Sequence, residues 1–598
     1  MKKDNFYSQE QIYEPLNEYK RVLKDMHNRN VNDYYDNLLE EAETDVEANR
    51  LTIKELRKLE KEAAHTKSSH AKWVGFRTLL IVLTIIAFVV GIYFILNNPI
   101  VVPILIGSGV ILVGIGIIVL IVKKINPKIK LLQATADELN RKIREKYNEA
   151  RNQMSSLNSL FRVEMAPELF TTTLPIINLD KQFDSRRLEY LINKFGLFED
   201  TDINRSTLYV QSGDINGNPF YISDNLYHEL GTKDYTGTLT IHWTTSSVDS
   251  NGRTTVRHHT QTLVATVTKP CPYYSTTPYL IYGNEAAPDL KFTRTDSDAE
   301  TMSDKQIEKH VNREIKKLKK KSNKAVDGIT VLGNEEFEVL WRAHDRNNEV
   351  QFRLLFTVLA QRELLALMKD KTVGFGDDFN FVKNKMINGV FPAHLHQLDL
   401  TIKAEYFHHY DVDQSRKIFV DYQNKYFKHI YFTFAPILAI PLYQQHKPHE
   451  YIYEDLYDSY VSFYEHEKVA NYIGEEHFKH PLSGTRNILK TSTVKSNDYC
   501  DYVTVSALGY ETIPRVDYIP KLGLDGNTHL VPVHWIEYIP VVSHRDIEIH
   551  VPKEEKIETH HDRFRKLFED LKDKKVDEEN IFKLSTFLVL LKDREMEE

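Results

Sequence analysis

The sequence predicts an α+β fold in which a two-helix transmembrane hairpin, continued by an antiparallel coiled-coil stalk, carries cytoplasmic mixed α/β domains with antiparallel sheet. Three observations lead to this prediction. Residues 78–122 contain no Asp, Glu, Lys, Arg or His. Apolar residues recur in steps of three and four on both sides of that stretch, as in heptad helices. Further along the chain, runs rich in Val, Ile, Thr and Tyr lie between turn residues, as strands do.

The charge-free stretch splits into two apolar runs, 78–96 and 100–122, around Asn97-Asn98-Pro99. Each run has about 20 residues, the length that a helix needs to cross ~30 Å of hydrocarbon. The alternative is a helical hairpin buried in a large soluble core, but such helices usually carry a polar face, and neither run has one. A signal peptide is not expected, because the first run follows a long charged segment and exceeds the usual apolar core of a signal.

Basic residues flank the hairpin at both of its outer ends, whereas the tip between the two runs carries no charge. Lysines and one arginine lie just before and just after the charge-free stretch, at Lys61, Lys67, Lys72, Arg77, Lys123, Lys124, Lys128 and Lys130. Basic flanks stay in the cytoplasm. We therefore expect a multi-pass protein of the cell membrane with both termini cytoplasmic and the lipid bilayer as its first partner.

Length and composition limit the remaining possibilities. A chain of 598 residues should form more than one domain. Its formal net charge of −8 argues against a general nucleic-acid-binding surface. Cys271 and Cys500 lie far apart, which argues against a disulfide framework and a cysteine-rich zinc site.

Six regions are predicted along the chain. They are N-terminal helices, the membrane hairpin, a second coiled-coil arm, a cytoplasmic α+β domain with a basic insertion, a second β-rich region and a charged helical tail, at residues 1–76, 78–122, 123–160, 161–400 (insertion 297–325), 401–550 and 551–598, respectively.

The N-terminal region should hold two helices. The first begins near Glu14, with Pro15 at its first position, and ends at a break over 27–30. The second carries a heptad row that polar residues interrupt, at Leu39, Ala42, Val46, Asn49, Ile53, Leu56, Glu60 and Ala63. A matching row follows the membrane runs, at Leu132, Ala136, Leu139, Ile143, Lys146, Ala150, Gln153 and Leu157.

The two rows predict an antiparallel coiled coil within one chain, because the membrane hairpin already holds the two helices close together. Pairing with another protein or another copy of the chain stays open as the alternative. Pro127 is expected to kink the junction between membrane run and arm.

The cytoplasmic α+β domain should begin with a helix over 184–195. Strands are expected at 207–211, 219–223, 236–245, 254–268 and 279–282, with Asn251-Gly252 as a hairpin turn. A basic helix with capping residues Ser303 and Gln306 lies in the insertion. Two helices over 334–342 and 349–369 follow, and short strands flank the turn at 376–378.

The second β-rich region and the tail complete the prediction. The apolar, proline-broken segment 429–443 is expected to form a buried strand or a membrane-facing segment. Strands are predicted at 502–507, 529–534 and 547–551, with Asp525-Gly526 as a tight turn. The tail should be helical from Glu554, and a second tail helix carries Ile581, Leu584, Leu588 and Leu591 on one face.

One part of the chain resembles a known family. The resemblance rests on residues 332–339, 345–349 and 353–357, and departs from the family at Val358, where proline is expected. Over roughly 161–400 the chain resembles bacterial membrane proteins defined by a cytoplasmic domain of unknown function. The resemblance implies one or two membrane helices, and no particular activity follows from it. It points to a LemA-type membrane protein as a partner.

Motifs for common enzyme chemistry are missing from the sequence. There is no GxxxxGK[ST] loop, no complete dinucleotide fingerprint and no GxSxG elbow. Histidines and aspartates gather in 394–480, at His394, His396, His408, His409, Asp411, Asp413, His446, His449, His466, His477 and His480. None forms HExxH, and hydrogen-bonded or surface histidines are the preferred interpretation, with 408–413 the best metal candidate. No catalytic, cofactor-binding or metal residue is assigned.

The basic helix over 305–321 has three interpretations. Its lysines could bind anionic lipid or nucleic acid. A solvated, flexible insertion is preferred, because the apolar row of Ile307, Val311, Ile315 and Leu318 is thin for membrane insertion.

The expected function is a membrane-anchored cytoplasmic scaffold or tether with an unknown protein partner. The alternatives are a membrane-bound metal-dependent enzyme that uses the His/Asp cluster in 394–480, and a channel or transporter accessory subunit. A homo-oligomer stays open, no nucleic acid is expected as a partner, and no cofactor is implied.

Overall fold

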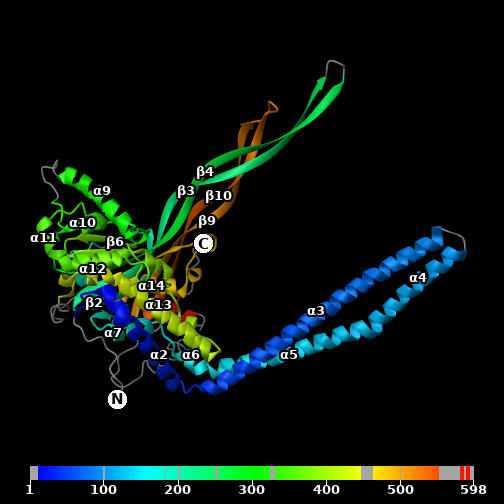
Figure 1. Cartoon of the computed structure of the whole chain (residues 1–598), viewed down its shortest axis with the longest axis horizontal. Coiled ribbons are helices and arrows are strands. Elements are labelled where there is room, and N and C mark those ends of the chain that lie inside the picture. The colour runs from blue at the N-terminus through cyan, green and yellow to red at the C-terminus, as the bar shows by residue number, and fades with distance from the viewer. Residues whose placement is uncertain are drawn as a thin grey trace. The chain divides into compact units, whose positions relative to one another are not determined.

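The computed structural model describes residues 11–97, 101–181, 183–198, 202–248, 253–322, 330–445, 462–497, 500–550, 580–584 and 587–592. It is a mixed α/β protein with antiparallel sheets and two long apolar helices (Figure 1). The chain forms two compact units. We call residues 32–161 and 404–422 the helical unit, and residues 1–31, 162–403 and 423–598 the sheet unit.

Long helices build the helical unit. Its elements are α3 (Val46–Asn97), α4 (Val101–Leu120), the π-helical turn η2 (Ile121–Ile125), α5 (Asn126–Gln153), α6 (Ser155–Leu160) and η5 (Ala404–Phe407), with parts of α2 (Lys24–Glu41) and α13 (Val412–Leu438). Helix α3 carries the first heptad row from Val46 onward and runs without interruption into the first apolar run, whereas Leu39 and Ala42 of that row lie in α2 and the turn after it. Helix α3 lies against both α4 and α5 (Figure 1). A π-helical turn, Ile121–Ile125, immediately precedes α5, and Pro127 lies at the start of α5; the kink expected there stays a prediction.

Two helices are long and apolar enough to cross a membrane, within Val46–Tyr93 and Ile106–Gln153. Only 11% and 17% of their most apolar windows are buried. A core helix of a soluble protein would be covered on most sides. The alternative of a hairpin buried in a soluble core therefore has no support from the packing of the described residues.

A polar residue of the first heptad row, Asn49, contacts a polar residue of the second row, Gln153. The Asn49 side-chain amide donates to Gln153 Oε1 at 3.2 Å and to the carbonyl of Tyr410 at 3.0 Å. Next to them Ile53, Leu56 and Ala150 form a buried cluster. Lys146 binds Glu55 at 2.8 Å on the surface of the same helix pair.

The N-terminal helix is longer than predicted. It begins at Pro15 as expected, through α1 (Pro15–Glu18) and η1 (Tyr19–Leu23), but α2 continues to Glu41, so the predicted break over 27–30 is wrong. Tertiary contacts satisfy the polar residues that suggested the break. His27 Nδ1 lies 2.8 Å from Thr173 Oγ1, its ring stacks on Phe427, and the Asn30 amide donates to the same Thr173 hydroxyl.

Two antiparallel sheets form the centre of the sheet unit. The larger has the order β1-β2-β3-β4-β7-β6-β5, with strands Ile177–Leu179, Arg205–Ile215, Asn218–Val248, Thr254–Gly283, Ile387–Pro392, Phe379–Asn384 and Lys291–Arg294. The smaller has the order β11-β12-β10-β9-β8, with strands Ile581–Lys583, Leu588–Leu591, Thr528–His550, Cys500–Leu522 and Ile488–Asn497.

Helices cover these sheets. They are α7 (Met165–Thr173), α8 (Ser185–Asn193), α9 (Asp304–Ser322), α10 (Glu335–Trp341), α11 (Glu349–Leu355), α12 (Val358–Lys369), α14 (Phe463–Ile473) and the C-terminal part of α13. Helix α14 contributes to two cores: Tyr464 packs with α8 against the larger sheet, and Val469 and Ile473 pack on the smaller sheet.

The predicted strands are present, but several are parts of longer ones. Residues 219–223 and 236–245 belong to the single strand β3, and 254–268 and 279–282 belong to β4. Strands β3 and β4 pair from Phe220–Tyr282 to Val248–Thr254, which confirms the predicted hairpin; its turn lies outside the described residues. The turn at Asp525-Gly526 is confirmed, with Gly526 at φ +83°, a value that favours glycine.

Four local predictions need correction. The helix predicted over 349–369 is broken, because the Thr357 hydroxyl accepts from Ala360 N and caps α12 as a separate helix. Segment 429–443 is not a strand: most of it is the C-terminal part of α13, which contains Pro436 and ends two residues after it, at Leu438. Of the strands expected around 376–378, only β6 forms among the described residues.

The fourth correction concerns the tail. Ile581, Leu584, Leu588 and Leu591 do not form a helix, because β11 and β12 add to the edge of the smaller sheet, where Leu588–Leu591 are all buried. The tail helix predicted from Glu554 lies outside the described residues.

The basic helix α9 is packed. Ser303 N and Oγ both lie 2.8 Å from Gln306 Oε1, which confirms the predicted cap. Ile307, Val311 and Ile315 are buried, and α9 lies against α10. A flexible, solvated insertion is therefore wrong for residues 304–322. The helix still exposes six lysines, Lys305, Lys309, Lys316, Lys317, Lys319 and Lys320.

Candidate functional site

The histidines of 394–480 serve separate local structures. His394 Nδ1 lies 2.7 Å from Asp378 Oδ2, its Nε2 lies 3.0 Å from the carbonyl of His429, and its ring stacks on Phe375. His429 Nδ1 in turn lies 2.9 Å from the carbonyl of His394. Burial, followed by the neighbouring His394, lowers the pKa of His429 to about 4, so this ring is neutral at physiological pH.

The best metal candidate of the sequence, 408–413, forms the start of a helix. Asp411 Oδ1 accepts from the backbone N–H groups of Asp413 and Gln414, as an N-terminal cap does, and its other oxygen binds Arg57 at 2.7 Å. Asp413 binds Arg50 at 2.9 Å. His409 Nδ1 accepts from Asp411 N, and His408 is exposed. These residues cap α13 and hold it to α3, and they do not converge on one point.

The remaining histidines are also dispersed. His466 is buried on α14, with Nε2 3.0 Å from Asp501 Oδ2. The ring of His477 packs edge-on against Phe582, and His480 Nδ1 accepts from Leu482 N. His396 is exposed, and His446 and His449 lie outside the described residues.

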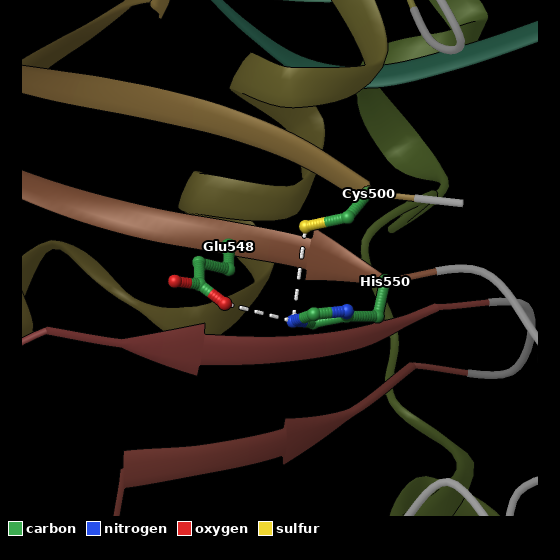
Figure 2. Close-up of side chains that lie close together, drawn as sticks. All are labelled: Cys500, Glu548 and His550. Atoms are coloured by element: carbon green, nitrogen blue, oxygen red, sulfur yellow. Dashed lines mark hydrogen bonds and ion pairs between the residues drawn. The ribbon is translucent and has the colours of Figure 1, made fainter. Parts of the chain in front are cut away.

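One group of three potential metal ligands does converge within the described part of the chain. It consists of Cys500, Glu548 and His550, whose ligand atoms all lie within 4.8 Å of one another (Figure 2). His550 Nε2 lies 3.0 Å from Glu548 Oε2 and 3.8 Å from Cys500 Sγ. No member of this group lies in 394–480.

Strand register positions the three residues. Cys500 begins β9 and is the direct cross-strand partner of His550 at the end of β10. Glu548 precedes His550 by two residues and therefore points to the same face of the sheet. The opposite face carries Val503, Ile547 and Ile549, which belong to a hydrophobic core.

The surroundings shift the pKa of the Cys500 thiol and that of the Glu548 carboxylate in opposite directions. Burial raises the pKa of the Cys500 thiol to about 11, so the free thiol is protonated and unreactive at neutral pH. The hydrogen bond from His550 lowers the pKa of Glu548. Lys592 binds the other carboxylate oxygen of Glu548 at 3.1 Å and keeps that group anionic.

Cysteine spacing gives no sign of this group, because Cys271 and Cys500 lie far apart in the chain and form no CxxC motif. The signal was the turn at Asp525-Gly526. A hairpin extended symmetrically from that turn pairs Leu522 with Thr528 and, with no bulge, Cys500 with His550. The length of the hairpin, which sequence alone did not indicate, decided whether the two residues met.

A second feature is a pair of ribbons that extend beyond their sheets. The outer parts of β3–β4 and β9–β10 pack face to face around Ile241, Leu263, Ala265, Val531 and Val533 (Figure 1). We call this pair of ribbons the β-arm. Lys269 of β4 binds Asp517 of β9 at 2.7 Å and lies over the ring of Trp535. Gln261 Oε1 accepts from Leu524 N in the β9–β10 turn.

The β-arm has a buried, apolar inner face and an exposed, polar outer face. On β3 the alternation is regular: Gly237 and Ile241 are buried, whereas Thr236, Thr238 and Thr240 are exposed. Threonine hydroxyls pair across the outer face, at Thr236–Thr266 (3.1 Å) and Thr240–Thr262 (3.2 Å). A single two-stranded ribbon is marginally stable in water, and the inner contact provides the hydrophobic layer that each ribbon lacks.

The helical unit has an open hollow at the end of its apolar helices. It is lined by Trp73, Lys123, Lys124, Pro127, Lys128 and Leu131. Tryptophan and lysine are the residues found where membrane helices leave the hydrocarbon.

No family model, no curated protein and no solved structure matches the chain. The function proposed below therefore rests on the residues of the chain itself.

Proposed function

We propose that the chain is a membrane-anchored scaffold or tether of the cell membrane, with both termini and all folded domains in the cytoplasm. The observation that carries this proposal is the exposure of two charge-free apolar helices. Leu83 and Ile115, for example, are 44% and 45% exposed, and only 11% and 17% of the most apolar windows of the two helices are buried. Lipid is the solvent that such surfaces require.

The flanks support the orientation. Lysines and Trp73 gather at the end of the apolar helices where α5 begins, as expected on a cytoplasmic face. In this proposal α3 and α4 form the membrane hairpin, and α3 and α5 continue it as an antiparallel coiled-coil stalk. The contact of Asn49 with Gln153 supports that stalk, because a polar pair in an apolar seam specifies register.

A scaffold is favoured over a metal-dependent enzyme built on 394–480, because the described histidines and aspartates of that segment make separate local contacts or are exposed, and none belongs to a convergent group of ligands. The β-arm offers a long polar surface for a protein partner, for which a LemA-type membrane protein is our candidate. Anionic lipid is a further partner for α9, through its exposed lysines only, since its apolar row is buried in the protein.

Membrane anchoring can be tested with paired substitutions at the two exposed positions. Leu83→Arg with Ile115→Arg places a charge in each apolar run, at a cost of ~2.5–3.5 kcal/mol per residue for insertion. We expect the native chain to resist alkaline carbonate extraction of membranes and the double-arginine variant to be released. Leu83→Ala with Ile115→Ala is the control, and it should stay in the membrane. Release of the native chain by carbonate would contradict anchoring.

The scaffold class is tested by purification from detergent-solubilised membranes. We expect a companion protein at close to equimolar amount, and no ion flux after reconstitution of the chain alone into liposomes. Flux that the double-arginine variant abolishes would favour a channel subunit instead.

A further inference from the structure

We propose that Cys500, Glu548 and His550 form a binding site for a divalent zinc ion at the base of the β9–β10 hairpin. The proposal concerns the sheet unit alone and does not depend on membrane anchoring. It rests on register, on distances between ligand atoms and on the balance of charge around them.

The distances between ligand atoms are close to those of a zinc site. Tetrahedral zinc with one sulfur, one nitrogen and one oxygen ligand places those atoms about 3.4–3.6 Å from one another. The sulfur–nitrogen distance is 3.8 Å and the nitrogen–oxygen distance is 3.0 Å. The sulfur and the carboxylate oxygen lie within 4.8 Å of each other, so side-chain rotation that draws the thiol and the carboxylate together would place all three ligand atoms around one ion (Figure 2).

The chemistry of the three donors also fits zinc. Thiolate and imidazole are the ligands that zinc prefers, and carboxylate completes many of its sites. Thiolate and carboxylate together balance the two charges of the ion, while the imidazole stays neutral. When the ion binds, the thiol proton leaves to solvent and the sulfur–zinc bond forms, with no change of oxidation state.

The neighbours of the group keep the ligands in position. Lys592 holds the far oxygen of Glu548 and leaves Oε2 directed toward His550. Cys500 and His550 cannot separate without breaking the pairing of β9 with β10, because each is the Cα partner of the other. An ion at this point would fasten the hairpin where it joins the smaller sheet.

The chain offers a built-in control, since Cys271 and Cys500 are its only cysteines. We suggest purifying the full chain in detergent with a tag that contains no histidine, removing metals under reducing conditions, and titrating with Co²⁺. Cobalt bound by a thiolate gives a charge-transfer absorption in the near ultraviolet. We expect one equivalent in the native chain and in Cys271→Ser, displacement by Zn²⁺, and loss of the band in Cys500→Ser. His550→Gln and Glu548→Gln should each weaken binding by at least ~10-fold.

A second measurement covers a Cys500→Ser variant that fails to fold. In the metal-free native chain, added Zn²⁺ should slow amide hydrogen exchange at 500–502 and 548–550, because the ion ties these strand ends together, and leave exchange around Cys271 unchanged. Absence of the thiolate–cobalt band in the native chain, its persistence in Cys500→Ser, or equal exchange at 500–502 and 548–550 with and without zinc would each overturn the proposal.

Discussion

At the scale of residues, two ion pairs are removed from water. Arg294 and Asp377 are both fully buried, and the guanidinium also lies over the rings of Trp341 and Phe379. Asp377 Oδ2 accepts from Ser297 N at 2.7 Å. Arg346 and Glu338 form a second such pair, with 1% of each side chain exposed. Neither pairing follows from sequence spacing, because the partners meet only through the fold.

Loss of one partner of a buried pair should be costly. Asp377→Ala leaves the charge of Arg294 buried without a counter-ion, and we expect ~3–5 kcal/mol of destabilisation. Thermal unfolding of the full chain in detergent, followed by far-ultraviolet circular dichroism, measures the effect. Glu537→Gln, which removes the exposed pair with Arg515, is the control and should cost below ~1 kcal/mol. Equal midpoints for the two variants would contradict the role of burial.

Glu465 makes stability depend on pH. Burial raises the pKa of this α14 carboxyl to about 7, against an opposing effect of Lys468. A carboxyl whose pKa is higher in the folded state than in the unfolded state adds to the stability of the fold while it is protonated. This contribution is complete below the unfolded pKa of ~4.5 and is lost as the pH rises toward 7.

Glu465→Gln should therefore increase the free energy of unfolding at pH 8 by on the order of a few kcal/mol and raise the thermal midpoint with it. At pH 4.5 the same substitution should change both quantities little. Midpoints of the native chain and the variant, measured across this range, test the sign. A variant that is destabilised equally at both pH values would show that Glu465 is not buried as a neutral acid.

At the scale of elements, local signals predicted where helices and turns begin, and long-range contacts decided how far they continue. Asp184 caps α8 and Asn334 caps α10, close to the expected starts, because each cap is a contact between near neighbours. The break at Thr357 is also local, but the apolar stripe on both sides concealed it. Leu588–Leu591 formed a strand, since four consecutive buried positions complete a sheet edge that the sequence does not reveal.

The candidate site, Cys500 with Glu548 and His550, also depends on long-range contacts that local sequence signals do not predict. Its residues are ordinary strand positions on one face, and their convergence depends on a hairpin that keeps its register from Asp525-Gly526 to Cys500. Composition predicted neither the length of β9 and β10 nor their packing on β3 and β4.

Close packing of the two ribbons predicts a sensitive glycine. A Cβ at Gly237 would overlap with the carbonyl oxygen of Pro532. Gly237→Ala should force the ribbons apart, at ~1–3 kcal/mol or more, and speed amide hydrogen exchange in 235–243 and 531–533. Gly333→Ala is the matched control, because no atom lies within 4 Å of its Cβ position. Unchanged exchange in both segments would mean that the β-arm does not depend on this contact.

At the scale of the whole molecule, the charge-free stretch was the strongest signal in the sequence. It predicted two membrane-length helices from composition alone; α3 contains the first run, and α4 with the π-helical turn after it covers residues 101–122 of the second. The heptad rows predicted that helices continue on both sides, because their periodicity is local. The partner of the chain and its process are not encoded in such local patterns, and they follow only from the surfaces that the fold presents.

The orientation of the hairpin is the central claim, and a single accessibility measurement tests it. Cys271 and Cys500 are buried, so an introduced cysteine supplies the reactive thiol. In intact cells, a membrane-impermeant maleimide should label Asn98→Cys, between the two apolar runs, and should label Arg151→Cys, exposed on α5, only after permeabilisation. Labelling of Arg151→Cys in intact cells, or protection of Asn98→Cys until the membrane is opened, would contradict a cytoplasmic scaffold anchored by this hairpin.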